Sequence, residues 1–97
     1  MRTVIETPTF QKQAATVWRA EERDAFINFI AENPDAGEVI PGADGARKVR
    51  WVRPGMGKRG GARVIYFHLV QDEVVLLVMI YAKAERENVK PTQIKRS

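Results

Sequence analysis

The sequence contains no cysteine, which excludes disulfide bonds and thiolate ligands for a metal ion. It contains a single histidine, His68, and this excludes a metal site built from several histidines. We expect no cofactor, and no metal site of either of these kinds. No apolar run reaches the ~18 residues needed to span a bilayer, and the N-terminal residues lack the apolar core of a signal peptide. These absences indicate a soluble, cytoplasmic protein that does not enter a membrane.

Acidic residues are missing from one long stretch of the chain. Residues 45–71 contain seven Lys or Arg and no Asp or Glu, whereas residues 1–44 contain four Lys or Arg and eight Asp or Glu. The net charge of +4 therefore hides a basic block that follows an acidic half. Such a block is typical of a surface that binds an anion such as nucleic acid, although a solvated face that keeps the protein soluble has the same composition.

The 97 residues are expected to form a single domain, 1–97, of the α+β class. Hydrophobic periodicity and the start and stop signals of helices predict the elements in chain order. They are strand 2–6, helix 8–16, helix 20–33, a turn-rich connector 33–45, strands 46–53, 62–70 and 73–83, and one or two helical turns within 84–95. Short connections make the last three strands a meander, with Gln71-Asp72 as a tight reversal. The expected architecture is a mostly antiparallel sheet with the helices packed on one face.

A glycine-rich, basic stretch, RPGMGKRGG, stands at 53–61, directly before a strand-like run. Part of it matches the G-x-G-x-x-G spacing of dinucleotide-binding proteins, but that site requires a helix after the glycines, and here a strand follows. A shorter match, GKRG, to the GXXG loop of the KH module fails because that loop joins two helices. We expect a wide, mobile β-loop, whose cations Arg53, Lys58 and Arg59 can close over an RNA strand.

The strands on either side of this loop carry basic residues on one face. Alternation places Lys48 and Arg50 on the face opposite the apolar residues of their strand. Arg63 lies near the start of the next strand, and the last strand ends in a Tyr-x-Lys pair whose two side chains share a face. If the meander aligns as antiparallel neighbours, a polar cluster forms at one end of the sheet. Its expected members are Arg53, Arg63, Tyr81 and Lys83.

Two aromatic side chains of the basic block have alternative interpretations. Trp51 can be a core or groove residue, or it can stack on a nucleic-acid base. His68 lies within a strand, where a packed or surface histidine is favoured over a catalytic base. Neither residue decides the function by itself.

Three segments together resemble a known family. The patterns G-x-R-K-V-R-W, then P-G-x-G-K-x-G-G-x-R-V-I-Y-F, then L-x-x-I-Y-A-K-x-E-R-E-N span residues 45–88. They are similar to the RelE/HigB-type toxins of bacterial type II toxin–antitoxin modules, in the RelE/ParE superfamily, and most of all to its HigB-like branch. The upstream NPDAGEVIPG at 33–42 also fits, and PTQIK at 91–95 resembles the start of the terminal helix of that branch.

The resemblance implies an endoribonuclease that cuts mRNA in the ribosomal A site without a metal ion and so inhibits translation. It implies a cognate antitoxin with a helix-turn-helix DNA-binding domain, so that operator DNA is bound only through the antitoxin complex. By position, the catalytic candidates are Arg63, which would contact the scissile phosphate, Lys83, Lys58 and Tyr81. The candidates for RNA binding are Lys48, Arg50, Arg53, Arg59, Arg86 and Trp51.

The residues leave two other functions open. A nucleic-acid-binding module without catalysis would carry the same basic surface. A protein-interaction domain that serves mainly in repression with an antitoxin is the other alternative. Cleavage of a message in a translation extract separates the enzyme from both.

Overall fold

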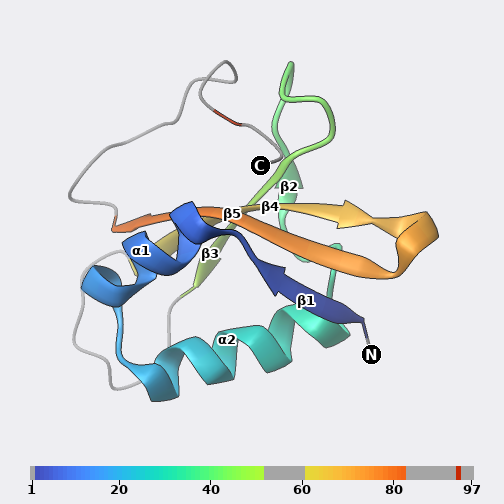
Figure 1. The fold of residues 1–97 in the computed structure, drawn as a ribbon. Helices are drawn as coiled ribbons and strands as arrows, with labels where there is room; N and C mark the ends of the chain where they lie inside the picture. Colours follow the sequence, from blue (N-terminus) through green and yellow to red (C-terminus); the bar gives the residue numbers. More distant parts are fainter. Residues whose placement is uncertain (1, 52–60, 83–93, 95–97) are drawn as a thin grey trace.

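The computed structural model describes residues 2–51, 61–82 and 94 of the chain. Two α-helices, one short 3-10 helix and five strands occur within these residues (Figure 1). In chain order they are β1 (Thr3–Glu6), α1 (Pro8–Val17), α2 (Ala20–Glu32), β2 (Glu38–Val39), β3 (Arg47–Trp51), β4 (Ala62–Leu69), the 3-10 helix η1 (Val70–Asp72) and β5 (Val74–Ala82). Among the described residues, no helix has the length and apolar character required to cross a membrane.

The five described strands form one sheet in the order β1-β5-β4-β3-β2. β1 runs parallel to β5, and all other neighbouring strands pair antiparallel. β5 thus lies inside the sheet, between β1 and β4. Its near-continuous apolar sequence, VVLLVMIYA, suits this position because a strand inside the sheet is covered on both faces.

Both helices cover one face of the sheet, which we call the helix side (Figure 1). Phe10 and Ala14 stand four residues apart on α1, and Phe26 and Ile30 do so on α2, so each pair points to one side of its helix. All four side chains are buried against β-strand residues such as Val64. The helical period of the sequence therefore explains how α1 and α2 close the main core.

The opposite face, which we call the loop side, carries a second and smaller apolar cluster. Ala43 and Ala46 belong to the connection between β2 and β3, and they pack against buried side chains of β4 and β5. Ile94 contacts the same cluster. The sheet is therefore buried on both faces at its centre, and polar groups on the loop side lie beside this cluster.

The start of α1 is attached to an irregularity in β5. The pairing of β4 with β5 shifts after Ile65, which leaves Val78 as the additional residue of a β-bulge. The buried Thr7 hydroxyl donates to the Leu77 carbonyl at 2.9 Å and accepts from the Phe10 N–H at 3.2 Å. Thr7 therefore caps α1 and binds the backbone of the bulge with the same oxygen atom.

The expected α+β class, the mostly antiparallel sheet and the placement of the helices on one face are confirmed. The predicted strands and helices agree with the described elements to within a few residues. The connector predicted over 33–45 does contain turns, but the prediction missed a short strand within it, because Glu38–Val39 pairs with β3 as β2. A two-residue strand between turn residues has no alternation that could reveal it.

Two other predictions differ from the structure or fall outside it. The reversal after β4 is longer than Gln71-Asp72 alone, because η1 forms there and Glu73 adopts a left-handed conformation with φ of 55°. The helical turns predicted within 84–95 lie outside the described residues, apart from Ile94.

Candidate nucleic-acid interface

Three basic side chains, Lys48, Arg50 and Arg63, gather on the loop side of β3 and β4, and we call them the cationic row. Arg50 stands directly opposite Arg63 in the antiparallel ladder, and Lys48 stands opposite Ile65. Directly paired residues of such a ladder project from the same face. Because Ile65 belongs to the loop-side cluster, all three cations project on the loop side.

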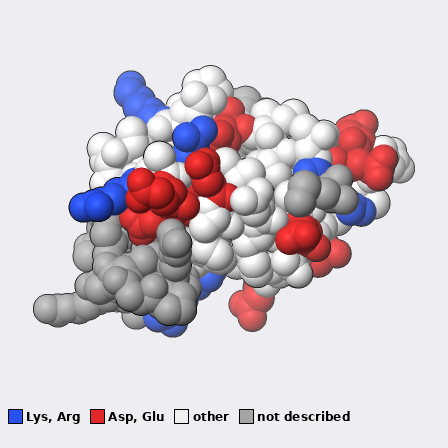
Figure 2. Space-filling view, turned by 90° about the horizontal axis from the view of Figure 1, so that it is seen from below, with Lys and Arg blue, Asp and Glu red and all other residues white. Residues whose placement is uncertain are grey.

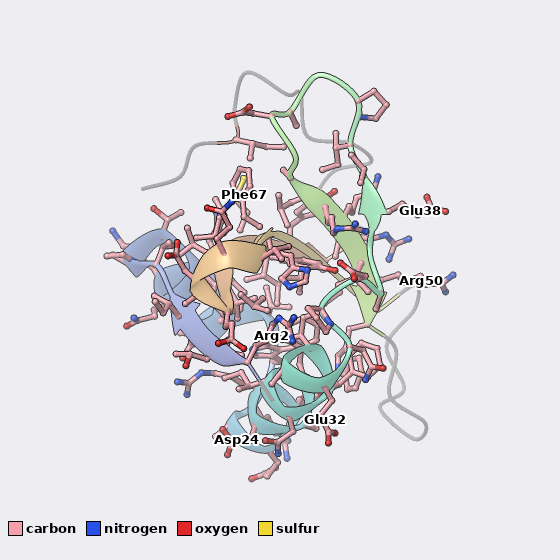
Figure 3. The ribbon with its side chains drawn as sticks, turned by 90° about the vertical axis from the view of Figure 1, so that its right-hand side faces the viewer. Arg2, Asp24, Glu32, Glu38, Arg50 and Phe67 are labelled. Carbon is pink, nitrogen blue, oxygen red and sulfur yellow. The ribbon has the colours of Figure 1, made fainter. Side chains whose placement is uncertain are left out.

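The cationic row is accessible to a ligand. Arg50 is exposed and extends outward from the β3 edge in Figure 3, while Lys48 and Arg63 are half-buried. Two like charges in directly opposed positions are unfavourable by themselves, and an anion placed between them would relieve that repulsion. Guanidinium groups also bind phosphate oxygens through forked pairs of hydrogen bonds. The Arg50–Arg63 pair is therefore suited to hold a phosphate.

Tyr81 extends the row by one strand, since it stands directly opposite Arg63 on β5. The expected proximity of Arg63 and Tyr81 is thus present. Tyr81 is only 2% exposed and belongs to the loop-side cluster, so its ring is a packing element beneath the cations. Its catalytic assignment stays a prediction.

Trp51 lies on the other face from the cationic row. Its ring packs against Phe29 and Phe26 of α2, with ring centroids 5.1 Å and 5.5 Å apart. The interpretation as a core residue therefore describes its contacts, although Trp51 is only partly buried. Base stacking by Trp51 stays a prediction, as no contact tests it.

Several candidates cannot be placed relative to the cationic row. Arg53, Lys58, Arg59, Lys83 and Arg86 lie outside the described residues. Their assigned roles in catalysis and RNA binding stay predictions.

A buried tyrosine fixes the segment that leads into β2. The Tyr66 hydroxyl donates to the Pro34 carbonyl and accepts from the Gly37 N–H, each at 2.8 Å. Burial raises the pKa of Tyr66 above its ordinary value of 10.0, so the phenol keeps its donor proton. A Cβ at Gly37 would lie 2.9 Å from the Lys48 carbonyl and from the Tyr66 ring. Glycine is therefore required for the close approach of this segment to the sheet.

An ionic cluster holds the same segment from its exposed side. The Asp35 carboxylate lies 2.8 Å from Nδ1 of His68 and 3.4 Å from Nη2 of Arg47. The hydrogen bond to His68, helped by the charges of neighbouring cations, holds the pKa of Asp35 below its ordinary value of 3.8. Arg47 also donates to the Gly37 carbonyl at 2.7 Å. These contacts position β2 beside Lys48, to which it pairs.

Sequence reasoning did not identify this anchoring cluster, although it correctly expected His68 to be a packed or surface histidine. The side chain of His68 is 6% exposed and its partner Asp35 is 33 residues away in the chain. No local spacing pattern links residues at such a separation. The turn residues Asn33-Pro34-Asp35 were the available signal, since they show that the chain reverses there.

Two surface hollows, each of about 410 Å³, lie away from the cationic row. One lies between α1 and α2 beside Trp18, and the other follows the C-terminal end of α2 at Asn33 and Pro34. Neither is lined by a residue of the row. Within the described part of the chain, no group of three or more acidic or histidine side chains is arranged to hold a metal ion.

Comparison with solved structures defines the fold. No protein-family model matches the chain. A chain of the intact E. coli RelBE toxin–antitoxin complex superposes with a TM-score of 0.63 at 19% identity, covering 89% of this chain and 100% of that one. A doubly substituted E. coli RelE toxin in the free state gives 0.57 at 17% identity, covering 89% and 87%. A metal-bound toxin from Helicobacter pylori gives 0.53 at 14% identity, covering 88% and 98%.

These likenesses define a small α+β fold that this chain shares with the three solved proteins. More particularly, the chain has the RelE-like fold, as the resemblance of residues 45–88 led us to expect. The agreement extends over 89% of the chain, which is more than the 45–88 segment that carries the resemblance.

Proposed function

We propose that this chain is the endoribonuclease toxin of a type II toxin–antitoxin module, and that it cuts mRNA by metal-independent attack of the 2′-OH. The observation that carries the proposal is the cationic row of Lys48, Arg50 and Arg63 on the loop side of a RelE-like fold. Cations at alternate positions of one strand, with a third on the neighbouring strand, suit the phosphates of an extended nucleic-acid strand. The acid-free block 45–71 supplies all three side chains.

The chemistry requires orientation and charge stabilisation. The 2′-oxygen forms a new bond to the adjacent phosphorus while the bond from phosphorus to the 5′-oxygen breaks. The 2′-OH proton passes to a base, and the leaving 5′-oxygen takes up a proton to become a 5′-OH. The other product is a 2′,3′-cyclic phosphate or its hydrolysed 3′-phosphate. Negative charge grows on the phosphoryl oxygens, so cations that hold them lower the barrier.

Arg63 is the residue assigned to the scissile phosphate, because it lies between Arg50 on one side and Tyr81 on the other. Lys48 would hold a neighbouring phosphate of the same strand. Proton transfer is assigned to the set Tyr81, Lys83 and Lys58, since a lysine crowded by other cations has a lowered pKa and can serve as base. The cations Arg53, Arg59 and Arg86 would add contacts to the RNA backbone.

The proposal includes a place of action and a partner. We assign cleavage to mRNA in the ribosomal A site, and thus to the cytoplasm, as expected for a HigB-like toxin. One of the similar solved structures is a toxin–antitoxin complex, which supports a cognate antitoxin for this chain too. We expect that antitoxin to carry a helix-turn-helix domain through which the complex binds operator DNA.

Replacement of Arg63 tests the function. Loss of one charge-stabilising contact typically lowers a rate by about 10²–10³-fold, so Arg63→Ala should abolish growth arrest on expression. Arg63→Lys keeps the charge but loses the forked contact, and should give intermediate arrest. Cleavage of a message in a translation extract, with the 5′ ends of the fragments mapped, measures the same loss directly.

The control is Lys12→Ala, which removes a cation from the exposed surface of α1 and should leave the arrest unchanged. A folded Arg63→Ala protein, checked by circular dichroism and thermal melting, that remains fully toxic would contradict the proposal. Binding of RNA without any cleavage by the unaltered chain would favour the alternative function, a non-catalytic nucleic-acid-binding or antitoxin-binding regulatory module.

A further inference from the structure

One carboxylate stands directly beside the cationic row. Glu38 of β2 pairs with Lys48 of β3 in the antiparallel ladder. Directly paired residues project from the same face with Cβ atoms about 4.5–5.5 Å apart. Glu38 therefore shares the loop side with Lys48, and it is exposed. In Figure 3, Glu38 and Arg50 both extend outward from the β2–β3 edge on the same side of the molecule.

The backbone position of Glu38 is fixed by the contacts of its two chain neighbours, Gly37 and Val39. Gly37, the residue before it, is held through its N–H by Tyr66 and through its carbonyl by Arg47. Val39, the residue after Glu38, is held by its pairing with Arg47 of β3. The charge of Glu38 therefore has a defined place at the Lys48 end of the row, even though its side chain is free to reorient at the surface.

A carboxylate at this position weakens the binding of a phosphate to Lys48. It attracts the ammonium group of Lys48 and repels any phosphate that Lys48 would bind. The Arg50–Arg63 pair lies two residue pairs further along the ladder, and β2 begins at Glu38, so no residue of β2 stands opposite Arg50. Attraction for phosphate is therefore weakened at one end of the row and left stronger at the other.

We propose that Glu38 is a positioning residue that makes the Lys48 end of the row the weaker phosphate site and so directs the scissile phosphate to Arg50 and Arg63. The inference rests on the proposed function in one respect, namely that the ligand is RNA. Weaker ground-state binding at Lys48 also serves turnover, because binding that is equal in the ground and transition states does not raise the rate of the chemical step.

Binding of an uncleavable RNA tests the inference. The probe is a fluorescent, single-stranded 2′-O-methyl decanucleotide, whose dissociation constant is measured by anisotropy at low salt. Removal of the repulsion by Glu38→Gln should tighten binding by about two- to fivefold, the range of a surface charge pair. The matched control is Glu32→Gln, which removes the same charge at the end of α2 and should change binding by less than ~1.5-fold, because the charge there is screened.

A double-mutant cycle assigns the effect to Lys48. In a Lys48→Ala background, Glu38→Gln should lose most of its effect, since the phosphate site that it opposes is gone. Equal effects of Glu38→Gln and Glu32→Gln would overturn the inference, as would weaker binding by Glu38→Gln, which would mean that the carboxylate contacts a donor on the RNA. An unaltered chain that binds no RNA would instead sink the proposed function, so the two failures are distinguishable.

Turnover gives a second readout. With a cleavable RNA of the same length, Glu38→Gln should lower KM and leave kcat unchanged or reduced. A purely structural role for Glu38 would lower the melting temperature and weaken binding together. That result would also overturn the inference.

Discussion

Asp35 shows how one side chain can hold a functional edge in place without touching it. Its carboxylate joins His68 of β4 to Arg47 of β3, and its own backbone leads into β2. An ionised carboxylate only accepts hydrogen bonds, so Nδ1 of His68 carries the proton that they share. The pKa of Asp35 is lowered chiefly by this hydrogen bond, which means that the folded state favours the ionised form.

A pH series should reveal this contact. A carboxyl group with a lowered folded-state pKa stabilises the fold above its unfolded pKa, and the stabilisation is lost as the pH falls through the folded value. Asp35→Asn should therefore be less stable than the unaltered chain above pH 5, and the two should converge below the ordinary pKa of 3.8. Urea denaturation at several pH values measures the difference.

Two controls accompany this series, namely a change of salt concentration and the substitution of a second carboxylate. Asp35 is 66% exposed, so added salt should reduce the difference between the two proteins. Asp24→Asn, on the exposed surface of α2, should show no comparable pH dependence. A stability gap between Asp35→Asn and the unaltered chain that persists unchanged to pH 2 would contradict the assignment.

Thr7 carries more of the fold than its place in the sequence suggests. The sequence predicts a helix start at Thr7-Pro8-Thr9, and the structure confirms it. What the sequence does not show is that the same hydroxyl reaches the carbonyls of Leu77 and Val78, about seventy residues away, at the bulge of β5. A bulge arises from the pairing of two strands, so no local sequence pattern predicts it. The strands with clear alternation, by contrast, were predictable.

Substitution of Thr7 measures this junction. Thr7→Ala should lower the free energy of unfolding by about 1–3 kcal/mol, because a helix cap and a buried hydrogen bond are lost together. Thr7→Ser keeps the hydroxyl and should retain most of the stability. Thr16→Ala is the matched control, since its hydroxyl bonds the Gln13 carbonyl at an exposed site. Equal urea midpoints for Thr7→Ala and Thr16→Ala would contradict the expected role.

The candidate site shows the same division between what a pattern predicts and what only the fold decides. Alternation within β3 correctly places Lys48 and Arg50 on one face, and the meander correctly brings Arg63 opposite its neighbours. Glu38 entered the site unforeseen, because β2 has only two residues and its pairing depends on the remote contacts of Gly37. The sequence thus predicted the cations that attract a phosphate, but not the carboxylate of Glu38 that repels it.

At the scale of the whole molecule, acidic side chains are prominent on the side of the sheet that the helices cover. Viewed from the helix side, Figure 2 shows Asp and Glu side chains in several clusters, with some Lys and Arg side chains between them. The cationic row lies on the other side, on β3 and β4. A polyanion is therefore attracted more strongly to the cationic row than to the acidic clusters, which favours productive encounters.

This asymmetry predicts how salt affects RNA binding. Each phosphate neutralised on a single strand contributes about −0.7 to the slope of log K against log salt concentration. Arg50→Ala should therefore make that slope shallower by about 0.7, as well as weakening binding at low salt. Lys12→Ala, which changes the net charge equally but on α1, should leave the slope unaltered. Slopes measured by anisotropy between 50 and 200 mM salt, a range over which polyanion affinities change steeply, decide the matter. If both variants change the slope equally, the net charge of the protein governs binding. That result would contradict a direct contact between the cationic row and the RNA phosphates.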